Sequence, residues 1–350
     1  MFGKSEMLYL YVETPLHAGS GSSVGLVDLP IQRERVTNYP LVQASGIKGK
    51  LRVEAYEWET FVKCKDGIKA VLTKRQDEGD EQFKQRSENE ARKQAAKKLG
   101  LEVVFGPEGD EAHVHAGALS PGDARLLLFP VRSLVGVFAW TTSRNVLARL
   151  MRDLLAARKT VPWTLDNLPD NGNAWTVDDK SVIANGKVVL EEFAFTAQQH
   201  DDVKAIAQWL VENALPQTDD YKYFREKLYL EKDGTTQGSL VILPEDAFRD
   251  FAQFATEVIT RIRVDQDKKT VAQGALWTEE HLPSDTLLYA PLHASRPRTD
   301  TNLFNGADGK SSAEEVLKFV KKLFENGRDR IQLGGDETVG RGIVKLKLGS

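Results

Sequence analysis

The sequence predicts an α+β fold of the ferredoxin-like type with long insertions. A strand, a helix, two strands and a second helix follow one another in the first part of the chain, and helix and strand patterns recur near its end. Stretches that are dense in charge, or rich in proline and glycine, interrupt this order and mark the insertions. The sequence contains no short tandem repeat of the solenoid kind.

The first predicted strand is Met7–Val12, where aromatic and branched residues predominate. After a glycine-rich loop, Ser45 has the residue type of an N-cap, and we expect its helix to end near Cys64. Residues 65–100 are rich in Glu, Lys, Gln and Ala, which predicts a charged helical insertion that is either solvated or mobile. Leu101–Phe105 is short and apolar.

The middle of the chain contains two expected buried strands, within Ala118–Val131 and Leu134–Thr142. Arg144–Lys159 has apolar residues at helical spacing and is predicted to be a helix. Residues 161–186 are rich in Pro, Asn, Asp and Gly, so they form an insertion or the edge of a linker. Its two tryptophans, at positions 163 and 175, either stack on bases or pack in the core, and packing is the preferred interpretation.

The last third alternates helices with strands. Further helices are expected over Gln198–Ala214, Pro244–Thr256 and Ala313–Glu325, and a hairpin over Thr260–Glu280 that turns at Asp267-Lys268. Ser311 and Ser312 stand at capping-box spacing before Glu314 and Glu315, and Gly327 stands where a C-terminal cap glycine is expected. The closing IQLGGDETVGRGIVKLKL predicts a strand, a glycine loop and a strand.

Composition restricts the class of protein. The chain has 350 residues, of which 41% are hydrophobic and 28% charged, as in ordinary globular proteins. A net charge of −4 argues mildly against a nucleic-acid binder but leaves room for a local basic groove. The single cysteine, Cys64, allows no intrachain disulfide, and no stretch has the pattern of a signal peptide or a membrane-spanning helix. We therefore expect a cytoplasmic protein without a membrane partner.

The loop after the first strand, HAGSGSSVGLVDLPIQRE, raises the question of a phosphate site. Its glycines at 19, 21 and 25 miss the dinucleotide-binding spacing by one residue, and Pro30 opposes the helix that this motif requires. No lysine follows Gly25, so the loop is not a nucleotide-binding P-loop. A close approach to an extended polyanion remains, because glycine lets the backbone come near a phosphate.

Polar and basic residues near the loop suit such a polyanion. Ser20, Ser22 and Ser23 have hydroxyl donors, and the start of the next helix adds main-chain N–H groups. Lys48 and Arg52 share one face of that helix. A tight turn beside a solvated basic face explains the same pattern, and from these residues alone it is the preferred interpretation.

Four motifs then indicate a family. LHAGSGSSVGLVDLPIQRE, YPLVQASGIKGKLR, GALSPGDARLLLFPVRSLVGVFAWTT and IQLGGDETVGRG, in this order, resemble the RAMP superfamily of CRISPR proteins. More narrowly they resemble the backbone (fourth) subunit of the type III-B (Cmr) RNA-targeting complex. The charged stretch at 65–100 and the segment at 161–250, an insertion or lid region, match least well.

The resemblance implies one RAMP domain over residues 1–350, with a modified RRM-like core and a thumb-like hairpin. Copies of the subunit stack head-to-tail along a guide (CRISPR) RNA, beside other Cmr subunits, and base pairing selects the complementary target RNA. In this family the subunit cuts the target RNA at regular intervals with a divalent metal ion, Mg or Mn. The aspartate that carries this activity corresponds to Asp28.

Asp28 suits the chemistry in two ways. An ordinary aspartate has a pKa of about 3.9, which makes it a weak base at neutral pH. It therefore holds the metal ion or orients the ribose 2′-OH for attack on the adjacent phosphate, and we prefer the first role with 2′-OH attack as the reaction. His17 is a second catalytic candidate, as an acid or a positioning group. Without the resemblance, a turn carboxylate and a structural histidine explain both residues.

Further candidates follow the same logic, each beside a plainer explanation. His113 and His115 form a pair that lacks a third metal ligand at recognisable spacing, and Glu279, Glu280 and His281 are a compact group for which we prefer a solvated loop over a metal or thumb role. Arg261 and Arg263 either meet the RNA backbone or belong to a surface salt-bridge face. The residues predicted to bind RNA are Gly19, Ser20, Gly21, Ser22, Ser45, Lys48, Lys50, Arg52, Arg261, Arg263, Gly335 and Arg341.

Two other functions stay open at this stage. The chain could be a purely structural guide-binding subunit whose partner cuts the target, or a metal-independent nuclease that processes the guide, as in other RAMP branches. Replacement of Asp28 separates the first of these from a target-cutting subunit, because only the latter loses cleavage while binding persists. The second requires cleavage of a precursor RNA.

Overall fold

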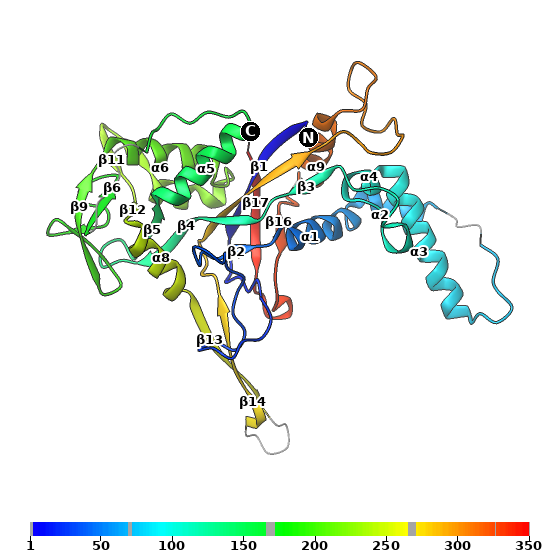
Figure 1. Ribbon diagram of the computed structural model, residues 1–350, viewed down its shortest axis with the longest axis horizontal. Coiled ribbons are helices and arrows are strands. Elements are labelled where there is room, and N and C mark those ends of the chain that lie inside the picture. The colour runs from blue at the N-terminus through cyan, green and yellow to red at the C-terminus, as the bar shows by residue number, and fades with distance from the viewer. Residues whose placement is uncertain (1–2, 69–71, 166–171, 265–270, 326, 350) are drawn as a thin grey trace. The chain divides into compact units, whose positions relative to one another are not determined.

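The computed structural model describes residues 3–68, 72–165, 172–264, 271–325 and 327–349 (Figure 1). The helices are α1 (Ala44–Tyr56), α2 (Glu59–Asp66), α3 (Asp80–Leu99), α4 (Leu101–Phe105), α5 (Arg144–Ala156), α6 (Asp201–Asn213), α7 (Lys222–Leu228), α8 (Glu245–Phe254) and α9 (Ala313–Leu323). The strands are β1 (Lys4–Val12), β2 (Leu41–Val42), β3 (Leu119–Pro121), β4 (Ala124–Arg132), β5 (Phe138–Ser143), β6 (Asn173–Thr176), β7 (Ile183–Ala184), β8 (Lys187–Leu190), β9 (Phe193–Gln199), β10 (Leu230–Lys232), β11 (Thr235–Gln237), β12 (Leu240–Leu243), β13 (Glu257–Val264), β14 (Val271–His281), β15 (Leu287–Ala294), β16 (Arg330–Gln332) and β17 (Ile343–Leu348).

One large mixed sheet dominates the fold. Its strand order is β16-β17-β1-β15-β4-β5-β12-β6-β9-β8-β7, with β2 paired to β4 and β3 paired to β15. Most pairs are antiparallel, as between β1 and β17, but β12 runs parallel to β5 and β6 runs parallel to β9. The predicted mixture of helices and strands is confirmed, and the ferredoxin-like arrangement stays a prediction.

The chain divides into two compact units, each assembled from segments that are distant in sequence. The first unit holds residues 1–5, 47–122 and 292–328, and the second holds residues 6–46, 123–291 and 329–350. The prediction of one RAMP domain over the whole chain stays a prediction beside this division.

The core of the second unit explains why β1 has no polar face. Leu8, Tyr9, Leu10 and Tyr11 are all buried, so both faces of this strand are covered. Trp140 of β5 is also fully buried, and its indole N–H donates to the Asp285 carbonyl at 2.8 Å. The hydrogen bond satisfies the one polar atom that this large side chain takes into the core.

Most predicted elements are present, with shifts at their ends. The predicted strands and the helices that became α5, α6, α8 and α9 are confirmed. Ser312 is the N-cap of α9 and accepts from the Glu314 N–H at 3.1 Å, whereas Glu315 pairs with Lys318. The expected cap at Gly327 was wrong, since α9 ends at Leu323 and Phe324 is its C-cap.

The first predicted helix was wrong in two respects. It is divided into α1 and α2 by a bend at Glu57–Trp58, and Ser45 lies inside α1 instead of capping it. The start of α1 has another partner, because the Asp123 carboxylate accepts from the Ala44 N–H at 2.8 Å. The carboxylate of Asp123 thus takes the capping role that was expected for the Ser45 side chain.

Two segments that were predicted to be insertions contain a helix or buried tryptophans where they are described. Within residues 65–100, the 20-residue helix α3 confirms a charged helix, and it buries alanines 91, 95 and 96. Trp163 and Trp175 expose 4% and 7% of their surface, so the preferred packing role is confirmed.

The predicted hairpin is formed by β13 and β14, which pair with each other in a sheet of their own. Figure 1 shows it reaching away from the large sheet of the second unit. Its predicted turn at Asp267-Lys268 lies outside the described residues. Among the described helices, none is long and apolar enough to span a membrane.

Candidate functional site

The loop that carries Asp28 is held against strand β14. Asp28 Oδ2 accepts from the Thr278 N–H at 2.8 Å and from the Thr278 hydroxyl at 2.9 Å. The Asp28 N–H lies 3.0 Å from the same hydroxyl oxygen, and Leu29 N–H donates to the Thr278 carbonyl at 3.0 Å. Glu280 N–H in turn donates to the Leu29 carbonyl at 3.0 Å. The loop therefore runs beside β14 as a short bridge and presents a fixed carboxylate.

The environment of Asp28 keeps its carboxylate ionised. The backbone and hydroxyl hydrogen bonds from Thr278 lower the pKa of Asp28 below its ordinary value. The side chain is exposed, and among the described residues Oδ1 has no hydrogen-bond partner. One carboxylate oxygen is thus anchored while the other faces solvent.

His17 lies beside the same strand, with its tautomer set by a carbonyl. Its Nδ1 is 2.7 Å from the Glu280 carbonyl oxygen, which only accepts, so Nδ1 carries the proton and neutral His17 has a free lone pair on Nε2. A Cβ at position 19 would stand 2.7 Å from that Nε2. The loop therefore requires glycine at position 19, because any side chain would cover the open nitrogen of His17.

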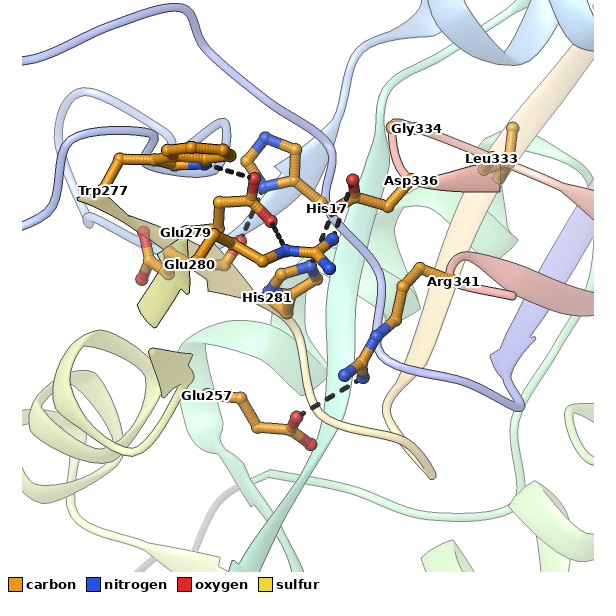
Figure 2. Close-up of polar contacts among 12 residues, drawn as sticks. His17, Glu257, Trp277, Glu279, Glu280, His281, Leu333, Gly334, Asp336 and Arg341 are labelled. Carbon is orange, nitrogen blue, oxygen red and sulfur yellow. Dashed lines mark hydrogen bonds and ion pairs between the residues drawn. The ribbon is translucent and has the colours of Figure 1, made fainter. Parts of the chain in front are cut away.

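The closing glycine loop packs on His17 from the other side. Gly335 N–H donates to the His17 carbonyl at 2.9 Å, and a Cβ at Gly334, whose φ is +76°, would stand 2.1 Å from that carbonyl oxygen. Two glycine motifs far apart in sequence therefore meet at His17. In Figure 2, His17, Gly334 and Asp336 lie on neighbouring segments of these two loops.

Glu280 is structural, and the preferred solvated loop for residues 279–281 was wrong. These residues are the buried end of β14. The Glu280 carboxylate accepts from Arg33, from the Thr256 hydroxyl at 2.8 Å and from the Ile31 N–H at 3.1 Å. With all these donors directed at it, Glu280 fastens the chain after the Asp28 loop to the base of the hairpin.

Glu279, His281 and Asp336 form the one described cluster with the dimensions of a metal site. One ligand atom from each lies within 4.8 Å of the others. Arg261, however, donates from Nε to Glu279 at 2.8 Å and from Nη2 to Asp336 at 2.9 Å, so a guanidinium already supplies the positive charge. Figure 2 shows Glu279 between Trp277 and Asp336, and the Trp277 indole N–H donates to Glu279 at 2.7 Å.

Burial favours the neutral form of both His281 and Asp336, but the net pKa shift of Asp336 is decided by its contacts. Burial lowers the pKa of His281, whose side chain is fully buried, and this favours the neutral ring. Burial also opposes ionisation of Asp336, yet its contacts with Glu279, His281 and Arg261 bring its pKa below the ordinary value. The cluster is thus a carboxylate–guanidinium network that joins the hairpin to the closing glycine loop.

The two arginines predicted to bind RNA from the hairpin have different environments. Arg261 is engaged in the network above, whereas Arg263 is exposed. Arg341 of the closing loop lies 3.9 Å from Glu257, an ion pair that is visible in Figure 2. Burial raises the pKa of Glu257.

The predicted basic strip on α1 is largely occupied by internal contacts. Arg52 donates to the carbonyls of Phe105 and Gly106, and Lys50 pairs with Glu54 at 2.9 Å. Burial, followed by the nearby Arg52 and Arg298 charges, lowers the pKa of Lys48. These basic residues belong to the first unit, whereas Asp28 and His17 belong to the second.

Two serine hydroxyls of the first loop make hydrogen bonds within the loop, and a third serine is exposed. Ser20 Oγ donates to the Pro30 carbonyl at 3.1 Å, and Ser23 Oγ accepts from the Gly25 N–H at 3.1 Å. Gly21, with a φ of +98°, and Ser22 are exposed at the tip. His113 is exposed and His115 half-buried in the first unit, and neither belongs to the described three-ligand cluster.

Sequence reasoning missed Thr278 and Asp336. Thr278 is separated from Asp28 by 250 positions, and no local pattern relates them. Asp336 stands in the quoted GGDETVGRG motif, so its presence was visible but its role was not. Asp336 itself has a left-handed backbone, with φ of +63°, which aspartate adopts more readily than most residues other than glycine.

Asp28 fits one mode of divalent-cation binding. Mg²⁺ commonly takes one or two carboxylate oxygens and completes its shell with water and phosphate oxygens. The open Oδ1 of Asp28, on an exposed loop with a lowered pKa, has the chemistry for that role. The Glu279, His281 and Asp336 cluster fits less well, because Arg261 occupies it.

Comparison with known proteins identifies relatives along almost the whole chain. The model of the RAMP superfamily matches residues 9–345. A curated relative, CRISPR system Cmr endoribonuclease Cmr4 from Pyrococcus furiosus, is 34% identical over 346 residues, which are 99% of this chain and 96% of the relative.

Solved structures agree with this match. The crystal structure of oligomeric Cmr4 from Pyrococcus furiosus superposes with a TM-score of 0.62 at 28% identity, covering 99% of this chain and 98% of that chain. A cryo-EM structure of the type III-B Cmr-beta complex bound to cognate target RNA contains a chain with a TM-score of 0.63 at 21% identity, again over 99% and 98%. The second likeness supports the fold alone.

Proposed function

The chain belongs to the RAMP superfamily, and from this premise we propose that it is the endoribonuclease subunit of a type III-B CRISPR complex in antiviral defence. It binds guide RNA and cuts complementary target RNA at regular intervals. The observation that carries the proposal is the full-length similarity to a Cmr endoribonuclease, together with an exposed, anchored carboxylate in the matching loop.

Several finer points belong to the same proposal. Its core is an RRM-like, ferredoxin-like domain with insertions, and copies of the chain stack along the guide beside other Cmr subunits. The oligomeric crystal structure of a relative supports self-assembly. We propose a cytoplasmic location, which agrees with the single cysteine.

The proposed reaction is attack of a ribose 2′-oxygen on the adjacent phosphorus. A P–O2′ bond forms and the P–O5′ bond breaks, leaving a 2′,3′-cyclic phosphate and a 5′-hydroxyl. His17 Nε2, unprotonated in the tautomer that the Glu280 carbonyl selects, accepts the proton of the 2′-hydroxyl. A proton from solvent reaches the leaving 5′-oxygen.

Asp28 has the second role in this proposal. Thr278 holds its Oδ2, so that Oδ1 is presented to the RNA in one orientation. A divalent ion held by Asp28 would offset the negative charge that develops on the phosphate. The exposed Gly21 and Ser22, at the tip of the loop, allow the RNA backbone to approach closely.

Replacement of Asp28 tests the proposal. Asp28→Ala, assembled with guide RNA and partner subunits, is expected to bind target RNA like the wild type while the regular cuts fall by at least about a hundredfold. Asp179→Ala is the matched control, since Asp179 is also an exposed aspartate of the second unit. Cuts that persist in Asp28→Ala would make the chain a structural subunit and transfer the nuclease to a partner.

The chemistry has its own test. A target with a single 2′-deoxyribose at a cut position is expected to resist cleavage at that position only, because the attacking oxygen is missing. Equal cleavage there would refute 2′-OH attack and leave the assignment of Asp28 open to a hydrolytic mechanism.

A further inference from the structure

A groove of about 880 Å³ in the second unit is lined by residues other than those of the site described above, except for Thr256, which donates to Glu280. Most of its lining residues come from helix α8 and from the turn and start of strand β9, two elements that are labelled in Figure 1. Its apolar surface comes from phenylalanines: Phe251 is buried, whereas Phe193 and Phe254 expose 56% and 73% of their surface. Phe193 packs edge-on against Phe251 with ring centroids 5.8 Å apart. Exposed aromatic rings beside a groove are typical of protein interfaces.

The rim of this groove is acidic. Four carboxylates line it, from Glu191, Glu192, Asp246 and Asp250. Arg132 pairs with Glu191 at 2.8 Å, and Arg249 pairs with both aspartates at 3.0 Å. Four carboxylates against two guanidinium groups leave two negative charges.

The aromatic floor and the acidic rim together indicate which class of partner the groove can bind. A phosphate backbone would be repelled by the net negative rim, so the groove is unsuited to RNA. A protein surface with an apolar side chain beside a lysine or arginine satisfies both the aromatic floor and the acidic rim. Glu192 is exposed, and no ion pair to it is found among the described residues, so it is the carboxylate most available to such a cation.

We propose that this groove receives a neighbouring copy of the same chain. The inference rests on the proposed function, in which copies stack head-to-tail along a guide RNA. Such an interface is heterologous, so each copy needs one receiving surface and a different inserting surface. The chain exposes suitable apolar residues next to arginines, namely Val36 beside Arg35 and Ile262 beside Arg263.

The test separates contacts between copies from contacts with RNA. Wild type and Phe254→Ala bind two single-stranded RNAs, one long enough for a single copy and one several times longer. Leu155→Ala is the matched control, because Leu155 is 57% exposed on α5, outside the groove. Thermal unfolding confirms that each variant is folded. For Phe254→Ala we expect unchanged affinity for the short RNA and about a tenfold loss of coupling between neighbours on the long RNA.

Reversal of the charge at Glu192 provides a second, independent test of the contact between copies. Glu192→Lys is expected to weaken coupling on the long RNA, because the rim then repels the neighbour's cation. Stronger coupling in this variant would mean that the facing surface is acidic and would overturn the proposal. Three other results would also overturn it. The first is equal coupling in Phe254→Ala and Leu155→Ala, and the second is no coupling in the wild type. The third is a loss of affinity for the short RNA in Phe254→Ala.

Failure of this inference is distinguishable from failure of the proposed function. Coupling is measured without any target RNA and does not depend on cleavage. A chain that never cuts target RNA but loses coupling through Phe254→Ala would refute the activity and keep the groove. If the chain cuts target RNA normally but Phe254→Ala leaves coupling unchanged, the proposed activity stands and the role of the groove is refuted.

Discussion

At the scale of single residues, the site depends on side chains whose role is to hold others. Thr278 contacts Asp28 through both its backbone and its hydroxyl, and the Glu280 carbonyl sets the tautomer of His17. Arg261 pairs with both Glu279 and Asp336. The catalytic candidates Asp28 and His17 are therefore both held in position by residues of β14.

Thr278→Val tests the control of Asp28. The variant keeps the backbone N–H but loses the hydroxyl donor, so the pKa of Asp28 rises towards its ordinary value. Ionised Asp28 is the active form, so the part of the acidic limb that reports Asp28, and not the part that reports the proposed base His17, is expected to move to higher pH. The less firmly held carboxylate is expected to lower the rate roughly tenfold at neutral pH. Single-turnover rates measured from acid to neutral pH check this. An unchanged limb would show that another group governs it.

Arg261 and Arg263 form a natural pair for comparison. Arg261→Met leaves the buried Glu279 without its cation, so we expect the free energy of unfolding to fall by about 2–3 kcal/mol. Arg263→Met removes an exposed charge and is expected to leave stability unchanged while weakening RNA binding. Denaturant titration and RNA binding at fixed salt separate the two effects. Equal stability of both variants would contradict the network.

At the scale of elements, two glycine loops and one hairpin converge on His17. The first loop follows β1, the second joins β16 to β17, and β14 lies beside both. Gly334 is required there because its φ is +76° and a Cβ would meet the His17 carbonyl oxygen. Gly340 in the same loop has the same φ but open space around it.

This contrast supplies a matched prediction. Gly340→Ala is expected to cost only the left-handed conformation, about 1–2 kcal/mol of stability. Gly334→Ala adds a clash with the His17 carbonyl, so it is expected to lose more stability and to slow cleavage well beyond the control. Chemical denaturation and cleavage assays of the two variants check both effects. Similar behaviour of the two would show that the contact with His17 is unimportant.

At the scale of the whole molecule, charge distribution decides how RNA is bound. The net charge is −4, and the groove beside α8 adds to the acidic surface. RNA affinity must therefore come from limited basic areas that meet phosphates. Such binding releases counterions and depends little on base sequence.

Salt titration checks this expectation. Without a guide, affinity for single-stranded RNA is expected to fall steeply between low and physiological salt and to be similar for unrelated sequences. The measurement is fluorescence anisotropy over a salt series with two RNAs of equal length. A strong preference for one sequence would contradict binding through the backbone.

Elements with strong local patterns, and the family, could be predicted from the sequence. The periodicity of α5 and α8, the alternation of β13 and β14, and the glycine motifs all depend on neighbours in sequence, so they were visible there. The same locality explains the errors. Ser45 looked like a cap, but Asp123 lies at the start of α1, and residues 279–281 looked solvated, but they end a buried strand.

Which side chains are free to act became known from the fold, not from the sequence. Arg52 looked available for phosphate yet binds the Phe105 and Gly106 carbonyls, and Glu280 is directed at Arg33, 247 positions away. Asp28 acquired its anchor from Thr278 across 250 positions. The physical reason is that a charged or polar side chain takes whichever partner the fold brings within hydrogen-bond distance, and that partner is not encoded by its neighbours in sequence.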